Sequence, residues 1–414
     1  MANRRWDLLP GDLLRSVVSR LRADDFVRAC SVSREWRLVL LKEPQLLSPA
    51  QEFPWLLLPS LRVGELPSSC SFLRIPDRRR FHLPYLPEIS GRRCVGSKDG
   101  WLVTLDLISL QPRILNPLTR AELPLPFLPT EAPGDEVRIR RRPDGSIYEF
   151  WYTRFANHEG NPPSKFPDLY VKKIALSTVP TGVTAVICGC VGINIIALAK
   201  PGDDRWSAVP DTPLDDYFED VVYREDDGRF YAVTGHASVL AFNVDGSMIS
   251  IVAPGRRLAA VGDIPSHDRY VVCSSGILLQ VWRISRCFFL PCGAHREMTV
   301  GFHVYKINPD GENNRTCGVP LKDLGDQCLF LGGRCSSVSV RAAGNLGLKK
   351  NCIFFTEDFP DTMFYAGKSE MATPFMNVGW YDFVEGKLGC YYPLLLDHVS
   401  SDWPAPIWFW PSLI

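Results

Sequence analysis

Several features that would mark a particular class of protein are missing from this 414-residue sequence. No apolar run approaches the roughly 18 residues that a membrane-spanning helix needs. The first residues lack the apolar core of a secretion signal, so we expect a protein of the cytoplasm, the nucleus or both. Acidic and basic side chains balance at 46 each, which removes any overall attraction to nucleic acid or to an anionic membrane.

Signatures of catalysis and of metal binding are also scarce. The sequence has no G-x-x-x-x-G-K-[ST] phosphate loop, no strand-linked G-x-G-x-x-G and no G-x-S-x-G nucleophile elbow. Cys287, Cys292 and His295 come closest to a metal site, but a matching fourth ligand is not evident. Cys188 and Cys190 are too close together for a redox pair and are expected to be buried in a strand. We therefore expect no catalytic residue, no metal, no cofactor and no structural disulfide.

Runs of charge are present, and turn residues adjoin them. The acidic pairs at 203–204, 215–216 and 226–227 favour solvated loops over a glycosidase acid/base pair. The basic runs at 78–80 and 138–142 suit nuclear import or an acidic partner. Neighbouring Pro, Asp and Gly residues favour the simpler interpretation, in which both runs are exposed hairpin turns.

Residues 4–44 carry a helical pattern. Pro10 and Gly11 precede apolar residues that recur at helical spacing as far as Leu21. Asp24 can cap a second helix, and a third short helix ends before Pro44. Three helices within about 40 residues bury too little apolar surface to be stable alone. The pattern leaves open whether they form a cap on the rest of the chain or a module that needs a partner.

The residue types of this stretch resemble the F-box motif. WDLLPGDLL at 6–14 and SVSREWR at 31–37 stand at the spacing of that family, with Ser33 where many members carry Cys. The resemblance implies that the module docks on the Skp adaptor of a cullin–RING ubiquitin ligase, with an apolar helix face in a groove. The positions that match the adaptor face or its immediate support are Leu9, Pro10, Leu13, Leu14, Val17, Leu21, Val32 and Trp36. Val32 and Trp36 are expected mainly to pack the helices together.

From about residue 50 the helical period gives way to short runs rich in β-branched and aromatic residues. Five Asp-Gly pairs, which tolerate the positive φ angles of tight hairpin turns, separate them. The clearest runs are 101–106, 147–153, 183–188, 193–198, 230–234, 270–273, 277–282, 300–305, 338–341 and 352–356. This pattern predicts an all-β sandwich, barrel or propeller.

Length favours the propeller. A blade takes roughly 40–50 residues, so the region allows about six to eight blades. A single sandwich of about 100 residues would leave most of the region unexplained. A short strand also precedes proline at Pro210, Pro254 and Pro320; the first two lie one blade length apart, and the third is further away, as an insertion would place it. Neither a WD40 nor a kelch pattern recurs.

Segments along nearly the whole region resemble the KIB-type β-propeller that accompanies F-boxes in many plant proteins. The matching segments are FPWLLLP (53–59), GWLV (100–103), LNPLT (115–119), KPGD (200–203), YFEDV (217–221), TVGFHVY (299–305), LFLG (329–332), NCIFFT (351–356) and PIWFWP (406–411). The resemblance implies a propeller that holds a protein target, and it identifies no residues that contact the target.

The sequence thus predicts a mainly β protein, with an F-box three-helix module over 1–48 and a β-propeller over 49–414. A propeller ring has a free edge unless its first and last segments share a blade, so we expect strands near 54–58 and 406–410 to close it. The leading hypothesis is a non-catalytic substrate receptor of an SCF-type (Skp–cullin–F-box) ubiquitin ligase. A propeller hydrolase with an incidental helical cap and an F-box scaffold that acts outside a ligase remain as alternatives.

Overall fold

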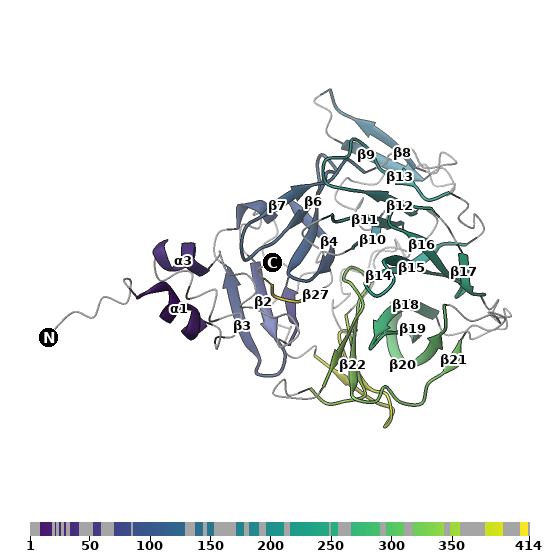
Figure 1. The fold of residues 1–414 in the computed structure, drawn as a ribbon. Coiled ribbons are helices and arrows are strands. Elements are labelled where there is room, and N and C mark those ends of the chain that lie inside the picture. Colours follow the sequence, from purple (N-terminus) through teal and green to yellow (C-terminus); the bar gives the residue numbers. More distant parts are fainter. Residues whose placement is uncertain are drawn as a thin grey trace.

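In the computed structural model, six sheets of four or five strands surround a common centre and form a six-bladed propeller (Figure 1). The residues that the structure describes are 9–18, 21, 25, 29, 34–40, 53–58, 70–83, 86–128, 137–143, 147–152, 171–177, 182–189, 196–210, 216–247, 250–255, 266–289, 295–309, 318–342, 348–356, 377–391 and 406–412. The prediction of a mainly β chain with a propeller is confirmed.

Each of the first five blades has four antiparallel strands. They follow in chain order from the ring centre outward, except that the innermost strand of blade 1 is β27. Blade 1 contains β27 (Ile407–Phe409), β1 (Trp55–Leu58), β2 (Cys70–Arg74) and β3 (Arg79–Leu83). Blade 2 contains β4 (Arg92–Lys98), β5 (Trp101–Asp106), β6 (Pro112–Leu115) and β7 (Glu122–Pro124). Blade 3 contains β10 (Val171–Leu176), β11 (Ala185–Gly189), β12 (Ile196–Ala199) and β13 (Ser207–Ala208).

Blades 4 and 5 repeat this arrangement, and blade 6 departs from it. Blade 4 contains β14 (Phe218–Arg224), β15 (Arg229–Thr234), β16 (Val239–Asn243) and β17 (Ser250–Ala253). Blade 5 contains β18 (Ser266–Ser274), β19 (Ile277–Phe289), β20 (His295–Ile307) and β21 (Val319–Pro320). Blade 6 contains β23 (Val338–Arg341), β22 (Gln327–Leu331), β24 (Cys352–Phe355), β25 (Gly379–Asp382) and β26 (Lys387–Cys390), and its β22–β24 pair is parallel.

Local sequence explains most of these strands. All ten runs singled out in the sequence overlap a strand. The Asp-Gly pairs at 99–100, 227–228 and 245–246 lie in hairpin turns where the glycine has a positive φ, +85° at Gly100. Gly96 is required for a different reason: a Cβ at this position would lie 2.1 Å from the carbonyl oxygen of Ile174. The inner strands of blades 2 and 3 can approach this closely only with glycine at that position.

The recurring prolines mark the outer edges of blades. Pro210 and Pro254 follow β13 and β17, and Pro320 lies in β21, and all three strands are the outermost of their blades. Proline has no N–H to donate to a further strand, so an edge is where a sheet tolerates it. Pro124 at the end of β7 belongs to the same set, although the spacing of the other three did not point to it.

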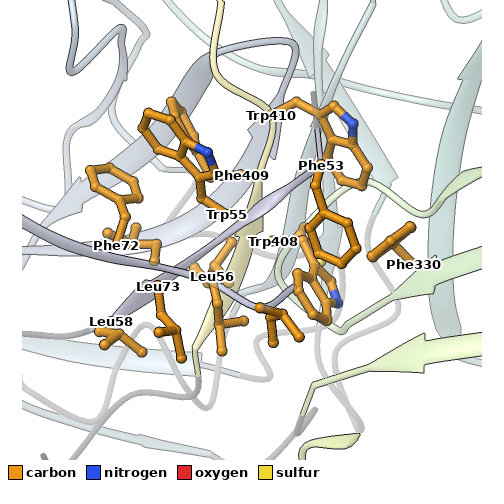
Figure 2. Packing of buried hydrophobic residues seen from close by; sticks show 14 of the residues in the cluster. Phe53, Trp55, Leu56, Leu58, Phe72, Leu73, Phe330, Trp408, Phe409 and Trp410 are labelled. Carbon is orange, nitrogen blue, oxygen red and sulfur yellow. The ribbon is translucent and has the colours of Figure 1, made fainter. Parts of the chain in front are cut away.

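The ring closes between the two ends of the chain. The register pairs Trp55 with Phe409 and Leu57 with Ile407. These residues belong to the two segments, 54–58 and 406–410, that were expected from the sequence to close the ring. Figure 2 shows the aromatic cluster around this seam, in which Trp55 and Trp408 are at most 1% exposed. The Trp408 indole N–H donates to the carbonyl oxygen of Leu331 in blade 6 at 3.1 Å, so the last strand also touches the neighbouring blade.

A segment of blade 6 crosses the ring centre. The N–H of Ser336 donates to the carbonyl oxygen of Ser97 in blade 2 at 3.0 Å. The next hydroxyl, Ser337 Oγ, donates to Asp220 in blade 4 at 2.8 Å. The hydroxyls of Ser339 and Ser274 are 2.7 Å apart and tie the segment to blade 5. We call residues 332–341 the central segment, because it bridges four blades across the axis.

The six blades lie at the lower end of the range expected from length. One reason is that β8 (Val137–Arg141) and β9 (Ile147–Tyr152) form a two-stranded sheet outside the blades. The other regular elements described are the helices α1 (Gly11–Val18) and α3 (Arg34–Leu40) and the 3-10 turn η4 (Pro87–Ile89). Neither of the two described helices has the length and apolar character needed to cross a membrane.

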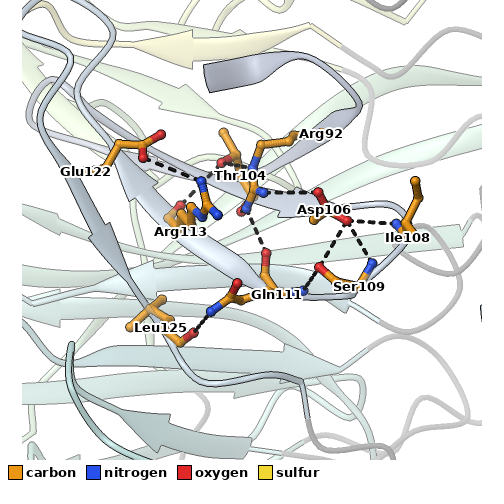
Figure 3. A network of polar contacts seen from close by, with 9 residues as sticks. All are labelled: Arg92, Thr104, Asp106, Ile108, Ser109, Gln111, Arg113, Glu122 and Leu125. Atoms are coloured by element: carbon orange, nitrogen blue, oxygen red, sulfur yellow. Dashed lines mark hydrogen bonds and ion pairs between the residues drawn. The ribbon is translucent and has the colours of Figure 1, made fainter. Parts of the chain in front are cut away.

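Blade 2 contains a polar network that predicts a dependence of stability on pH (Figure 3). Asp106 accepts hydrogen bonds from the N–H of Ile108 at 2.9 Å and of Ser109 at 2.7 Å, and from Arg92 at 3.3 Å. Burial by itself would raise the pKa of Asp106, but these donors outweigh it and hold the pKa below its usual value. The ionised form is therefore the one that the fold stabilises.

A carboxyl group with a lowered pKa contributes stability above its unfolded pKa of about 3.9, and the contribution is lost as the pH falls through the folded pKa. We expect Asp106→Asn to lower the free energy of unfolding by about 1 kcal/mol at pH 7. The difference in the free energy of unfolding between this variant and the unmodified protein should be smaller at pH 3. Urea unfolding at both pH values would measure it. As a control, Glu122→Gln in the same network removes only an exposed partner 3.5 Å from Arg113. An Asp106→Asn gap that is the same at both pH values would contradict this account.

Candidate functional site

The N-terminal helices present an apolar surface that nothing in the described part of the chain covers. In α1, Leu13 is 52% exposed and Val17 is 48% exposed. Their i, i+4 spacing places them on one face of the helix, and the exposed Pro10 precedes Leu13 by less than one turn. We call Pro10, Leu13 and Val17 the outer stripe. Half-exposed large apolar residues on one face are typical of a surface that binds a partner.

The opposite side of α1 faces the protein. Leu14 is 1% exposed and belongs, with Ala29, to the hydrophobic cluster that continues into the core of blade 1. Leu9, Leu21 and Trp36 are partly buried against the same cluster. Figure 1 accordingly places α1 and α3 outside the ring, on the side of blade 1. The helices are therefore held by one face while the outer stripe remains available.

The structure divides the predicted adaptor residues into two groups. Pro10, Leu13 and Val17 form the outer stripe, whereas Leu14 is too deeply buried to touch a partner and can only support the helix. Leu9, Leu21 and Trp36 are partly buried against the hydrophobic cluster and do not belong to the outer stripe. Val32 lies outside the described residues, and of the predicted second helix only Asp25 and Ala29 are described, both helical.

One exposed apolar residue of the module was missed in the sequence. Leu38 of α3 is 54% exposed. The helical period contained the signal, because Trp36 and Val39 pack inward and Leu38 lies between them in sequence, on another side of the helix. Leu38 is therefore a further candidate for contact with a partner.

Buried charges gather around the propeller axis, the second place where chemistry could occur. Lys172 binds Glu219 at 2.8 Å, and Lys173 forms an ion pair with Asp220. Asp220 also accepts the N–H of Val271 at 3.1 Å. These groups lie on the inner strands of blades 3, 4 and 5. Both carboxylates are occupied by cations and backbone donors, an arrangement that joins blades.

The structure places several of the other charged residues named from sequence. Asp216 is 7% exposed and 3.1 Å from Nδ1 of His236, so the expectation of a solvated loop was wrong for this carboxylate. Hydrogen bonds from the N–H groups of Tyr217 and His236 compensate for its burial. These bonds fix the segment that leads into blade 4. The basic runs both lie on hairpins, β2–β3 and β8–β9, as the simpler interpretation predicted. Arg79, Arg80 and residues 138–141 lie in the strands of these hairpins and not in the turns, so that part of the prediction was wrong.

Burial suppresses the reactivity of two of the described cysteines. Burial raises the pKa of the Cys94 and Cys273 thiols to about 12, so both are protonated and unreactive at neutral pH. Cys287 and His295 fall on the paired strands β19 and β20, while Cys292 lies outside the described residues. No group of three or more metal-binding side chains occurs in the described part of the chain.

Comparison with known proteins matches both parts of the chain. The F-box domain family matches residues 6–44, and the KIB1-4 beta-propeller family matches residues 72–382. Probable F-box protein At4g22165 of Arabidopsis thaliana is 25% identical over 355 residues, which is 85% of this chain and 84% of that protein. F-box/kelch-repeat protein KIB1 of the same plant is 23% identical over 359 residues, 86% of this chain and 78% of its own length. The chain therefore belongs to the F-box proteins that carry a KIB1-4 β-propeller.

Proposed function

We propose that this protein is a non-catalytic substrate receptor of an SCF-type ubiquitin ligase, acting in the cytoplasm, the nucleus or both. In this role the N-terminal helices bind a Skp-family adaptor, and the propeller holds a protein target. The observation that carries the proposal is the outer stripe. Leu13 and Val17 stay half exposed on a helix whose other side is buried, inside the segment that matches the F-box family.

Burial of the outer stripe supplies a physical reason to bind. Fully burying a leucine or valine side chain stabilises by about 1.5–3 kcal/mol relative to leaving it exposed. Leu13 and Val17 are already about half buried, so complete burial of both can contribute roughly half of that energy for each residue. The total is enough to change an affinity at least tenfold. The helix is preorganised by Leu14 on its inner side, so little ordering opposes the docking.

The propeller contributes proximity. Once the adaptor links the helices to a cullin–RING assembly, a target held on the propeller has a high effective concentration near the ubiquitin-charged enzyme. This mechanism requires no covalent chemistry from the chain itself. Against the alternative of a hydrolase, Glu219 and Asp220 near the axis are engaged by lysines, and the central segment lies across the axis.

Binding to a purified Skp-family adaptor tests the proposal. We expect Leu13→Asp/Val17→Asp to weaken adaptor binding at least tenfold in a titration by isothermal calorimetry, because charge replaces the outer stripe. Val17 is substituted in preference to Leu9, because Leu9 is partly buried against the hydrophobic cluster and its replacement would also affect folding.

The matched control replaces two exposed apolar residues of the propeller, Ile108→Asp/Val319→Asp, whose side chains are 65% and 62% exposed. This variant should bind the adaptor as the unmodified protein does. Failure of the unmodified protein to bind, or equal losses in the two double variants, would refute the proposed docking surface.

A further inference from the structure

The β8–β9 hairpin is the one described sheet that belongs to no blade. It is inserted between blades 2 and 3, and Figure 1 shows it on the outer rim of the ring beyond β13. The blades pair and close through β1 and β27 without any contribution from it. Its presence is therefore not explained by the closure of the ring.

One side of the hairpin is anchored. Ile147 is 2% exposed and Phe150 is fully buried, and both belong to a hydrophobic cluster shared with blades 2 and 3. Ile139, opposite Phe150 in the register, is partly buried against the same cluster. This packing holds the hairpin in place, so its other side is presented as a fixed surface.

The presented side is basic and aromatic. Residues 137–142 contain four arginines and no acidic residue, although the whole chain has no net charge. The side chain of Arg140 is 62% exposed, and Tyr148 is 51% exposed. The guanidinium of Arg142 lies over the Tyr148 ring, 5.2 Å from its centre. The stacking limits the motion of an exposed arginine and leaves its N–H groups able to bind.

We propose that this hairpin binds an acidic, extended segment of the protein target; the inference rests on the proposed receptor function and assigns a target chemistry to it. Arg140 lies in β8 and Arg142 directly follows the last residue of that strand. Two residues of extended chain span about 6.8 Å. Carboxylates at alternate positions of an extended peptide repeat at the same distance. Arginine binds carboxylates through paired N–H donors, so the spacing and the chemistry agree.

The carboxylate of Glu149 already pairs with Arg140, but this pair is compatible with binding of an acidic target segment. The Glu149 carboxylate is 3.0 Å from Arg140 and already shows an acidic group in place on this surface. The pair is exposed, and such pairs contribute little, so a target carboxylate can replace or join Glu149.

An acidic protein segment fits better than nucleic acid. Nucleic-acid surfaces neutralise many phosphates and usually carry a basic stripe over a whole face. Here the basic run at 138–142 covers only one short hairpin, on a chain with zero net charge.

The test measures binding of the full chain to a fluorescent peptide of six Glu-Ser repeats, by fluorescence polarisation at physiological salt. We expect Arg140→Ala/Arg142→Ala to weaken peptide binding about tenfold. A control that removes two arginines from the other basic hairpin, Arg79→Ala/Arg80→Ala, should bind as the unmodified protein does. Both variants change residues at exposed hairpin positions, and matching thermal unfolding curves verify their folding.

Three results would overturn the inference: no binding of the peptide by the unmodified protein, equal losses in both variants, or tighter binding of a twelve-nucleotide thymidine oligomer than of the peptide. The adaptor titration is a separate readout that does not involve this hairpin. Intact adaptor binding with no peptide binding would remove the inference and leave the proposed function standing. Peptide binding without adaptor binding would remove the ligase role and leave the acidic-segment site.

Discussion

Deleting residues 406–414 should abolish the cooperative unfolding transition of the propeller. The deletion removes β27, and with it the strand that pairs with β1 and closes the ring. Trp408 and Phe409 are fully buried, and Trp410 is 8% exposed. Removing a buried aromatic side chain costs about 3–5 kcal/mol. Three such losses approach the whole net stability of a domain, about 5–15 kcal/mol.

The lost contacts extend beyond blade 1. Ser97 Oγ in blade 2 donates to the carbonyl oxygen of Trp408 at 2.6 Å, and the side-chain amide of Asn116 donates to that of Ser412 at 2.9 Å. The deletion therefore leaves an unpaired strand edge together with buried polar groups that have lost their partners. Both consequences favour aggregation as well as unfolding.

Circular dichroism in the near ultraviolet and a thermal melt would measure the effect. The single variant Trp408→Ala keeps the strand and should lose about 3–5 kcal/mol. Phe127→Ala provides the aromatic control, because this ring is 59% exposed and its removal should change stability by less than about 0.5 kcal/mol. A deleted chain that melts cooperatively at the temperature of the full chain would contradict closure by β27.

Replacing Asp220 should destabilise the propeller almost as strongly as replacing a core aromatic residue. This carboxylate is 1% exposed and receives Lys173, two backbone N–H groups and the hydroxyl of Ser337. These donors come from blades 3, 4 and 5 and from the central segment. Removing one member of a buried ion pair leaves the other charge buried without compensation, which costs about 3–5 kcal/mol. We expect Asp220→Asn to lower the free energy of unfolding by that amount.

A double-mutant cycle separates the ion pair from the other contacts. Lys173→Met/Asp220→Asn should be less destabilised than the sum of the two single changes, because it removes both charges of this pair and leaves neither of them buried without its partner. Glu149→Gln is the surface counterpart, since its partner Arg140 is 62% exposed, and it should cost less than about 1 kcal/mol. Additive losses in the Lys173–Asp220 cycle would show that the two side chains do not act as a pair.

Local sequence determined the elements of this protein. Alternating β-branched and aromatic residues specify strands such as 101–106, and the Asp-Gly pair at 99–100 specifies the turn that precedes it, because both signals act over a few residues. The prolines at 210, 254 and 320 marked blade edges for the same reason. The F-box motif, with its Leu-Pro start and its Trp36 end, located the helical module.

Only the tertiary structure decided what covers each face. Leu13 and Leu14 are chemically identical neighbours, yet one is half exposed and the other is buried, because the core of blade 1 lies on one side of α1. Length allowed six to eight blades, and the insertion of β8–β9 is one reason that the ring has six. The bridge from Ser337 to Asp220 joins residues 117 positions apart, and no local pattern encodes such a contact. Periodicity specifies which residues share a face, whereas burial depends on chain segments that are distant in sequence.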